Sequence, residues 1–306
     1  MAQIVGPKNV TVPLESGHKG DSPPPSRVRP LRIVLAVVAT LGACYIAAIL
    51  WLMSQETRLV FQAGRPLGEG RPSFPFTQVD VPRSDGARQF AWAMENPDAR
   101  TWVLFLHGNS ATIASRVNIA RYRELRALGL SILAPEYRGF AGLPGVPTEP
   151  GLAADARAAF DYLVNTRHVS PARVVIYGWS LGSAVAVDLA ANAAEAAVVL
   201  EGAPASVADV GAQQYPFFPV RLIMRNPFDS IRKVDRIHAP MLFLHSPEDA
   251  IIPYTEGRRL YEAARTPKRF VDVRGGHLDA NEVDRAVFFG AIRSFLDEYG
   301  LLGHQE

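Results

Sequence analysis

The stretch Gly178-Trp179-Ser180-Leu181-Gly182 separates two segments of opposite character and decides the fold. Residues 173–177 before it, Arg-Val-Val-Ile-Tyr, are mostly β-branched or apolar and predict a buried strand. Residues 181–192 after it are rich in alanine and predict a helix. The glycines permit a tight turn and a close approach of that helix. Such a turn lifts the serine oxygen out of the sheet edge, beside a helix N-terminus that favours negative charge, so Ser180 is predicted to be a nucleophile.

Length and composition limit the classes to which the chain can belong. Its 306 residues suffice for one large domain with appendages. The net charge is +2 and charged residues make up 20%, which excludes a strongly basic nucleic-acid-binding chain and an acidic disordered one. Cys44 is the only cysteine, so neither an intramolecular disulfide nor a cysteine-based zinc site can form.

The N-terminal region predicts a membrane anchor. Residues 1–32 are rich in proline, glycine and scattered charges, and we expect a disordered, basic tail. The 21 residues 33–53 carry no charge, and a helix of that length matches the thickness of a bilayer core. Three arginines within 27–32 precede this segment closely, whereas only Arg58 follows at similar distance. The positive-inside tendency therefore predicts a transmembrane signal anchor with a cytoplasmic N-terminus and the remaining chain on the non-cytoplasmic side.

Two other interpretations of this segment stay open. A buried helix of a soluble domain can also be apolar, although 33–53 is long for one. Residues 41–44, Leu-Gly-Ala-Cys, resemble a bacterial lipobox, which would leave Cys44 lipidated after cleavage. Nine apolar or uncharged residues follow Cys44, whereas a mature lipoprotein usually turns polar there. This continuation favours the uncleaved anchor.

Strands alternate with helical patterns over residues 54–303, which predicts one α/β domain. Repeated alternation of this kind produces a mostly parallel central sheet with helices on both faces. An early hairpin with a turn at 84–86 precedes the parallel part. The predicted strands are 76–81, 89–94, 102–106, 131–134, 173–177, 197–200, 241–245 and 269–273, and the predicted helices are 111–128, 149–166, 181–192, 254–265 and 284–299.

The histidine that would activate Ser180 is indicated by its place along the chain. A serine hydroxyl is a poor nucleophile until a base takes its proton, and an acid must orient that base. With this type of elbow, the acid and then the histidine follow the serine in the sequence. The histidines after Ser180 stand at positions 238, 245, 277 and 304, and only His277 directly follows the last predicted strand. We therefore predict His277 as the catalytic base.

The orienting acid is expected after an earlier strand. Asp249 lies on the loop that leaves the predicted strand 241–245, and we predict that it orients His277. Its alternative role is to cap a turn near Pro253. Glu201 ends the preceding predicted strand and stays open as a second candidate acid.

Two backbone N–H groups are expected to stabilise the oxyanion of an acyl-transfer intermediate. One is that of Leu181, directly after the nucleophile. The second lies on the loop after 102–106, where the N–H of Asn109 fits best and Ser110 is the alternative. We expect His107 in this loop to be structural. The sequence has no His-Glu-x-x-His motif and no clustered acids, so neither a metal nor a cofactor is expected.

The chain carries its motifs in the order His107-Gly-Asn109, Tyr137-Arg-Gly-Phe140, Pro147-Thr-Glu149, Gly178-Trp-Ser-Leu-Gly182, Asp249 with Ile252-Pro253, and Gly276-His277. With these motifs it resembles the α/β-hydrolase superfamily over about residues 57–300, and most of all the membrane-anchored branch often described as a serine-aminopeptidase-like hydrolase domain. The resemblance implies the α/β-hydrolase fold, a short lid at about 203–238 and catalysis by the predicted triad. Some animal relatives remove palmitoyl groups from proteins, which makes thioesters conceivable substrates. Glu136, Ser183 and Ser246 depart from the family's usual residues and leave the choice of substrate open.

These features together predict a membrane-anchored serine hydrolase that cleaves carboxylic ester or thioester bonds through an acyl-enzyme. We expect a small-molecule or lipid-like acyl substrate, contact with the membrane through one helix, and no nucleic-acid partner. An aminopeptidase-like serine peptidase is the first alternative, and its substrate amine would need an acid near the lid, such as Asp209 or Asp229. A catalytically silent, membrane-tethered module is the second, and the complete triad disfavours it. Apolar residues at 215–219 and 222–224 predict either an acyl pocket or ordinary packing of two short helices.

Overall fold

A computed structural model describes residues 2–3, 6 and 28–303 of the chain. Most of the predicted N-terminal tail, residues 1–32, therefore lies outside the described residues. The chain divides into two compact units, of which the first ends at Ala48 and the second begins at Ile49. All of the predicted hydrolase domain, residues 54–303, belongs to the second unit.

Helix α1 (Val28–Phe61) has 34 residues, begins before the predicted membrane segment and continues past it. In the first unit its large apolar side chains are exposed, and the helix is long and apolar enough to cross a membrane. The last turns of α1 belong to the second unit, where Leu52, Val60 and Phe61 are buried. The end of this helix is therefore part of the globular core.

Eight strands within the described residues form one sheet, in the order β1-β2-β4-β3-β5-β6-β7-β8. β2 pairs in antiparallel fashion with β1 and β4, and all other neighbouring strands are parallel. The sheet confirms the fold class predicted from the sequence, and every strand overlaps a predicted one. The strands are β1 (Thr77–Pro82), β2 (Arg88–Met94), β3 (Trp102–Leu106), β4 (Ser131–Pro135), β5 (Val174–Trp179), β6 (Ala197–Glu201), β7 (Met241–His245) and β8 (Lys268–Asp272).

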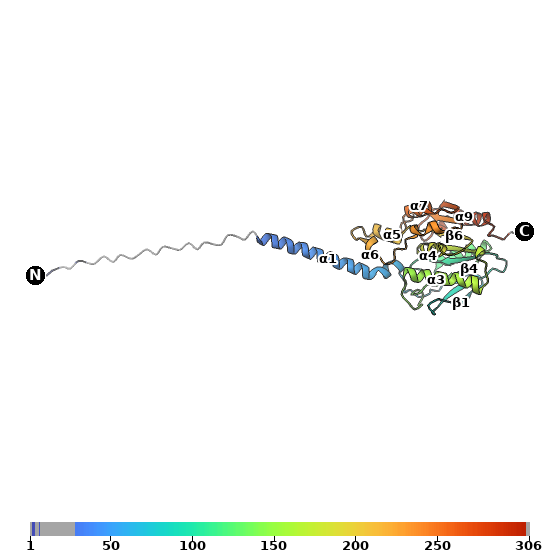
Figure 1. Ribbon diagram of the computed structural model, residues 1–306, viewed down its shortest axis with the longest axis horizontal. Coiled ribbons are helices and arrows are strands. Elements are labelled where there is room, and N and C mark those ends of the chain that lie inside the picture. The colour runs from blue at the N-terminus through green and yellow to red at the C-terminus, as the bar shows by residue number, and fades with distance from the viewer. Residues whose placement is uncertain (1, 4–5, 7–27, 304–306) are drawn as a thin grey trace. The chain divides into compact units, whose positions relative to one another are not determined.

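Helices cover both faces of the sheet (Figure 1). One face packs on α3, α4 and α7 through a core that includes Leu152, Val185 and Leu260. The opposite face packs on α2 and α9 through a second core that includes Leu125 and Phe288. Strands β3 to β7 are buried on both faces, which is why they form continuous apolar runs in the sequence. The helices are α2 (Arg116–Ala127), α3 (Glu149–Asp161), α4 (Leu181–Ala190), α7 (Tyr254–Ala263), α8 (Ala280–Val283) and α9 (Arg285–Glu298).

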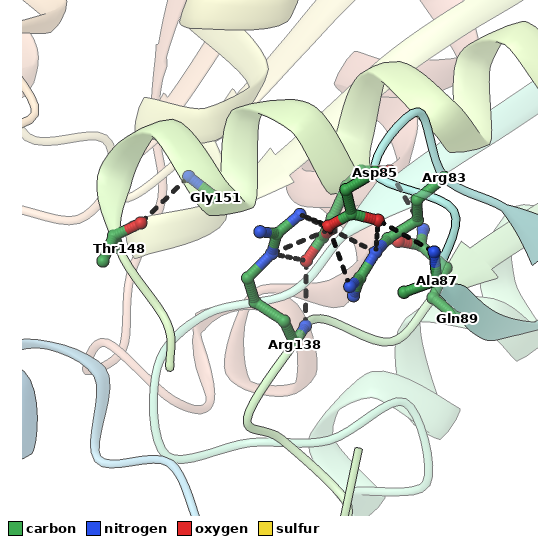
Figure 2. Close-up of polar contacts among 8 residues, drawn as sticks. Arg83, Asp85, Ala87, Gln89, Arg138, Thr148 and Gly151 are labelled. Atoms are coloured by element: carbon green, nitrogen blue, oxygen red, sulfur yellow. Dashed lines mark hydrogen bonds and ion pairs between the residues drawn. The ribbon is translucent and has the colours of Figure 1, made fainter. Parts of the chain in front are cut away.

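The start of α3 follows the sequence prediction, whereas its end does not. Thr148 Oγ1 accepts a hydrogen bond from the Gly151 N–H at 3.1 Å, which satisfies a donor of the first turn (Figure 2). Pro150 occupies a first-turn position where no N–H is needed. The helix predicted at 149–166 is α-helical only over α3 and then continues as a π-helical turn, η1 (Tyr162–Thr166).

An ion-pair network holds the loop after β4 against α3 (Figure 2). The fully buried carboxylate of Asp155 accepts hydrogen bonds from the Arg138 backbone N–H at 2.9 Å and from its guanidinium at 2.6 Å. The Arg138 guanidinium also lies 3.6 Å from the Asp85 carboxylate, which Arg83 contacts at 3.1 Å. The main-chain oxygen of Asp155 accepts from the Gln89 amide at 2.9 Å. The Tyr-Arg-Gly-Phe motif thus has a structural role, because the ion pair of Arg138 with Asp155 holds this loop against α3.

The segment predicted as a short lid, residues 203–238, connects β6 to β7. It contains two short helices, α5 (Val207–Gln214) and α6 (Val220–Ile223), which contact each other. Two 3₁₀ turns follow, η3 (Ser230–Arg232) and η4 (Val234–Arg236).

Candidate active site

Ser180 lies on the sharp turn between β5 and α4. Its φ of 56° is in the left-handed region, which is strained for a residue other than glycine. The turn requires its glycines, because a Cβ on Gly178 would lie 2.5 Å from the Gly182 oxygen and a Cβ on Gly182 only 2.0 Å from the Leu106 oxygen. The N–H of Ser180 donates to the Glu201 oxygen at 2.9 Å. The strained serine is therefore held by a hydrogen bond to the end of β6 and by the close packing of α4 against the ends of β3 and β5.

The structure brings Ser180, His277 and Asp249 into one hydrogen-bonded row. His277 Nε2 lies 2.7 Å from Ser180 Oγ, and its Nδ1 lies 2.6 Å from Asp249 Oδ2. Ser180 and Asp249 are buried, and the His277 side chain is only 5% exposed. With Asp249 accepting from Nδ1–H, Nε2 is free to accept the serine proton. This arrangement can convert the Ser180 hydroxyl into a nucleophile.

The environment of Asp249 keeps its carboxylate charged and fixed. Asp249 Oδ1 accepts hydrogen bonds from the Ile251 and Ile252 N–H groups, both at 2.8 Å. Burial tends to raise the pKa of Asp249, but the hydrogen bond and charge of His277, with these N–H donors, hold that pKa below its ordinary value. His245 lies nearby, and burial lowers the pKa of its imidazole. His245 contacts the Ile252 oxygen at 3.0 Å and thus orders the loop that carries Asp249.

Glu201, the second candidate acid, is engaged elsewhere. The buried guanidinium of Arg121 forms a two-pronged ion pair with it, in which Arg121 Nε lies 2.8 Å from Glu201 Oε2. The Tyr177 hydroxyl donates to the same oxygen at 2.6 Å. Arg121 also lies over the Trp179 ring at 4.4 Å, and Trp179 Nε1 lies 3.4 Å from the His277 main-chain oxygen. Trp179 therefore links the Arg121–Glu201 pair to His277, a role that no sequence pattern indicated.

The two predicted oxyanion donors lie beside Ser180. Leu181 opens α4, so its N–H is one of the free donors at a helix N-terminus. Leu181, Asn109 and Ser180 line the same cavity. The N–H of Ser110, the alternative donor, is taken by the Phe61 oxygen at 3.2 Å, and the Asn109 side-chain amide donates to the Val60 oxygen at 3.0 Å. The end of α1 thus anchors the loop after β3, and the Asn109 N–H remains the predicted second donor.

His107 has the structural surroundings expected from the sequence. The imidazole is fully buried, with Nε2 2.8 Å from Glu136 Oε1 and Nδ1 2.8 Å from the Gly108 oxygen. Glu136 Oε2 accepts a hydrogen bond from the Ile113 N–H at 3.1 Å. His107 and Glu136 therefore tie the loop after β3 to the end of β4.

A cavity of about 180 Å³ opens at Ser180. The lid contributes apolar side chains such as Val207, Ile223 and Met224. α1 contributes a second apolar wall that sequence reasoning missed. It consists of Leu52, Met53, Leu59 and Val60. The cavity is therefore suited to an apolar group attached to the reacting carbonyl.

The two lid acids considered for a peptidase do not line this cavity. Asp209 pairs with Arg221 at 2.5 Å and with Arg259 at 2.9 Å. Asp229 lies 3.4 Å from Arg232. Over the described part of the chain, no group of three or more His, Cys, Asp or Glu residues is placed to hold a metal ion.

Comparisons with known proteins agree with this fold. The model of the alpha/beta hydrolase family matches residues 103–272. An uncharacterised protein of Mycobacterium tuberculosis is 39% identical over 88% of this chain and 97% of its own length. The alpha/beta hydrolase domain-containing protein WAV2 of Arabidopsis thaliana is 27% identical over 87% of this chain and 95% of its own. A Pyrococcus furiosus esterase has a similar structure, with a TM-score of 0.68 at 18% identity, covering 78% of this chain and 97% of the esterase.

Proposed function

Because the chain belongs to the alpha/beta hydrolase family, we propose that it is a serine hydrolase that cleaves carboxylic ester or thioester bonds through an acyl-enzyme. The observation that carries this proposal is the row from Ser180 through His277 to Asp249, with contacts of 2.7 and 2.6 Å. A strained serine, a base within reach and a charged orienting acid are the parts that acyl transfer requires.

In the proposed acylation step, His277 Nε2 takes the proton of Ser180 as its Oγ attacks the carbonyl carbon of the substrate. The carbonyl oxygen becomes an oxyanion, which the N–H groups of Leu181 and Asn109 stabilise. Asp249 stabilises the charged imidazole without taking its proton. The C–O or C–S bond then breaks, the leaving group receives the proton from Nε2, and the acyl group stays on Ser180.

Deacylation uses the same groups in reverse. His277 takes a proton from a water molecule, whose oxygen attacks the acyl carbon. The bond to Ser180 breaks, Oγ regains the proton from Nε2, and the carboxylic acid leaves. The apolar walls of the cavity supply binding energy for the acyl group in both steps.

We further propose that residues 33–53 anchor the enzyme in a membrane, with residues 54–303 forming the catalytic domain and 203–238 its lid. Support comes from the length and apolar character of α1. The arginines before the segment favour a cytoplasmic N-terminus. Protease digestion of intact and opened vesicles tests this topology. Digestion of the catalytic domain in vesicles that expose only the cytoplasmic side would contradict it.

A fluorophosphonate probe tests the nucleophile. We expect the wild type to be labelled and Ser180→Ala to remain unlabelled, with ester hydrolysis falling at least about 10³-fold. The full chain in detergent should be used, because a fragment from Thr57 would lack Leu52 and Met53 from the cavity wall. Folded wild type that resists the probe would overturn the mechanism.

A panel of p-nitrophenyl esters, thioesters and aminoacyl amides then separates the reaction classes. We expect esters and thioesters to react faster than amides. Faster cleavage of amides would instead assign the enzyme to the serine peptidases.

A further inference from the structure

Glu56 stands out among the residues that line the cavity at Ser180. It lies on α1, one turn after Leu52 and Met53. Among the described lining residues it is the only acidic or basic side chain, and the others are mostly apolar. A carboxylate in such surroundings requires hydrogen-bonding partners.

The described residues provide hydrogen-bond partners for only one oxygen of this carboxylate. Glu56 Oε1 accepts hydrogen bonds from the Arg225 N–H at 2.9 Å, the Asn226 N–H at 2.8 Å and the Asn226 amide at 2.8 Å. Oε2 has no hydrogen-bond partner among the described residues. It is not one of the fully enclosed unpaired atoms, and Glu56 is one of the residues that line the cavity. Glu56 as a whole is only 9% exposed.

The three hydrogen bonds fix the direction of the carboxylate. They tie α1 to the lid segment at Asn226, whose own amide oxygen accepts from the Glu149 N–H at 2.7 Å. Glu149 in turn accepts from the Phe228 N–H at 2.6 Å. Oε2 is therefore held at a defined place in the cavity wall, which is the condition for selective binding of a ligand group.

The charge of Glu56 points to the class of ligand. No described Lys, Arg or His forms an ion pair with it, and the donors on Oε1 are neutral amides. In a cavity with apolar walls, a carboxylate without a protein counter-ion attracts a cation and repels an anion more strongly than it would in water.

We propose that Glu56 Oε2 binds the protonated amine of an acyl substrate, so that the enzyme prefers acyl chains that carry an ammonium group. This inference rests on the serine hydrolase proposed above. It makes Glu56 a specificity residue and gives α1 a function in substrate selection in addition to anchoring.

Matched p-nitrophenyl esters test the inference on the full chain in detergent. The acyl groups are aminobutyryl, aminohexanoyl and aminooctanoyl with a terminal amine, each paired with an alkanoyl and a terminal hydroxyacyl ester of equal length. We expect the wild type to prefer the amine at one chain length. Glu56→Gln keeps an oxygen for the three N–H donors and loses the charge. It should lower kcat/KM for the best amine ester at least about tenfold more than for the alkanoyl ester of equal length, mainly through KM.

Asp229→Asn is the matched control, because it removes one carboxylate charge from the lid outside the cavity and should leave the preference unchanged. Equal losses on amine and alkanoyl esters in Glu56→Gln would overturn the inference and reduce Glu56 to a lid anchor. Equal losses on amine and hydroxyl esters would overturn the preference for a cation.

A binding measurement separates this inference from the proposed function. In the wild type, hexylammonium should raise the Tm by more than hexanol does. In Glu56→Gln, the two compounds should raise the Tm equally. Absence of that difference overturns the ammonium site even where ester hydrolysis is found. Absence of probe labelling and hydrolysis in the wild type instead overturns the serine hydrolase, whatever hexylammonium does.

Discussion

Asp249 and Glu201 are two buried carboxylates at the ends of neighbouring strands, and different kinds of side chain contact them. Glu201 ends β6 and Asp249 follows β7, so both lie at the same edge of the parallel sheet. Asp249 contacts the His277 imidazole at 2.6 Å. Glu201 is held by the guanidinium of Arg121 and the hydroxyl of Tyr177. Position and burial therefore do not distinguish the acid that we propose as catalytic from the one that holds Arg121, whereas their partners do.

The difference follows from the chemistry of the two partners. An imidazole gains and loses a proton near neutral pH, so a carboxylate beside it can favour the charged form during a reaction. A guanidinium keeps its charge throughout, so Glu201 and Arg121 can only hold each other and the ring of Trp179. The charge of the Asp249–His277 pair can therefore change during a reaction, whereas the charges of the Glu201–Arg121 pair stay the same.

Of the variants that test this comparison, Asp249→Asn should change the activity most. The amide can donate to His277 Nδ1, which places the imidazole proton on Nε2, where it cannot accept the proton of Ser180. We expect kcat for ester hydrolysis to fall about 10³- to 10⁴-fold, measured with the full chain in detergent. The Tm should change little, because the amide oxygen can still accept from the Ile252 N–H. Retention of more than a tenth of the wild-type kcat would mean that another acid orients His277.

Glu201→Gln should have the opposite effect, with a large loss of stability and a small loss of kcat. It leaves the charge of Arg121 fully buried without its carboxylate, which costs about 3–5 kcal/mol in comparable cases. The contacts of His277 with Ser180 and Asp249 remain, so kcat should fall less than about tenfold. Chemical denaturation gives the change in the free energy of unfolding.

Removing both charges provides the control for this loss. Adding Arg121→Met to Glu201→Gln removes the unpaired charge and should recover part of the lost stability. A double variant that is less stable than Glu201→Gln alone would show that the ion pair itself is strongly stabilising. A larger loss of kcat in Glu201→Gln than in Asp249→Asn would exchange the roles assigned to the two acids.

The features that could be predicted from sequence are those that depend on neighbouring residues or on sheet topology. Buried parallel strands form apolar runs, so each strand of the sheet was found near its true bounds. The glycines around Ser180 are required because an added Cβ would lie 2.5 Å or less from backbone atoms, and they are visible as a short motif. Asp249 and His277 follow β7 and β8, and the carboxyl ends of parallel strands meet at one edge. The order of the chain therefore indicated these residues.

The features that could not be predicted depend on partners far apart in the sequence. Arg121 lies on a helix rich in charged residues and resembles a surface arginine, yet it is fully buried because Glu201 lies across from it. The end of α1 continues an apolar membrane segment, and nothing local indicates that Leu52 lines a cavity. Glu56 likewise resembles the polar flank of a membrane helix until the lid packs against it.

Glu195 extends the comparison to a third buried carboxylate, which is paired with neither an imidazole nor a guanidinium of the described residues. It lies between α4 and β6, it is 8% exposed, and its Oε2 has no hydrogen-bond partner among residues 28–303. Burial raises its pKa to about 7, and a backbone hydrogen bond and the charge of Arg157 only partly oppose this. The folded state therefore holds the proton to higher pH than the unfolded state. Stability should fall as pH rises from about 4.5 to about 7 and level off above that.

Glu195→Gln removes this pH dependence. The variant should exceed the wild type in the free energy of unfolding by at most about 3 kcal/mol above pH 7, with no difference below about pH 4.5. Denaturation at a series of pH values measures both limits. Parallel curves for the two proteins would mean that Glu195 is solvated or paired in the folded state. Asp249, whose pKa is lowered, contributes with the opposite sign, since its stabilisation is lost on acidification.

Trp179→Phe should have the smallest effect, because it alters the link between the two carboxylates without removing either. Phenylalanine keeps a ring beneath Arg121 but loses the indole N–H that lies 3.4 Å from the His277 oxygen. A hydrogen bond of that length contributes about 0.5–1 kcal/mol, so kcat should fall only two- to fivefold. The loss should appear in kcat and leave KM unchanged, because Trp179 does not line the cavity. An unchanged kcat would show that Arg121 and Glu201 stabilise the fold without positioning His277, and the two acids would then act independently.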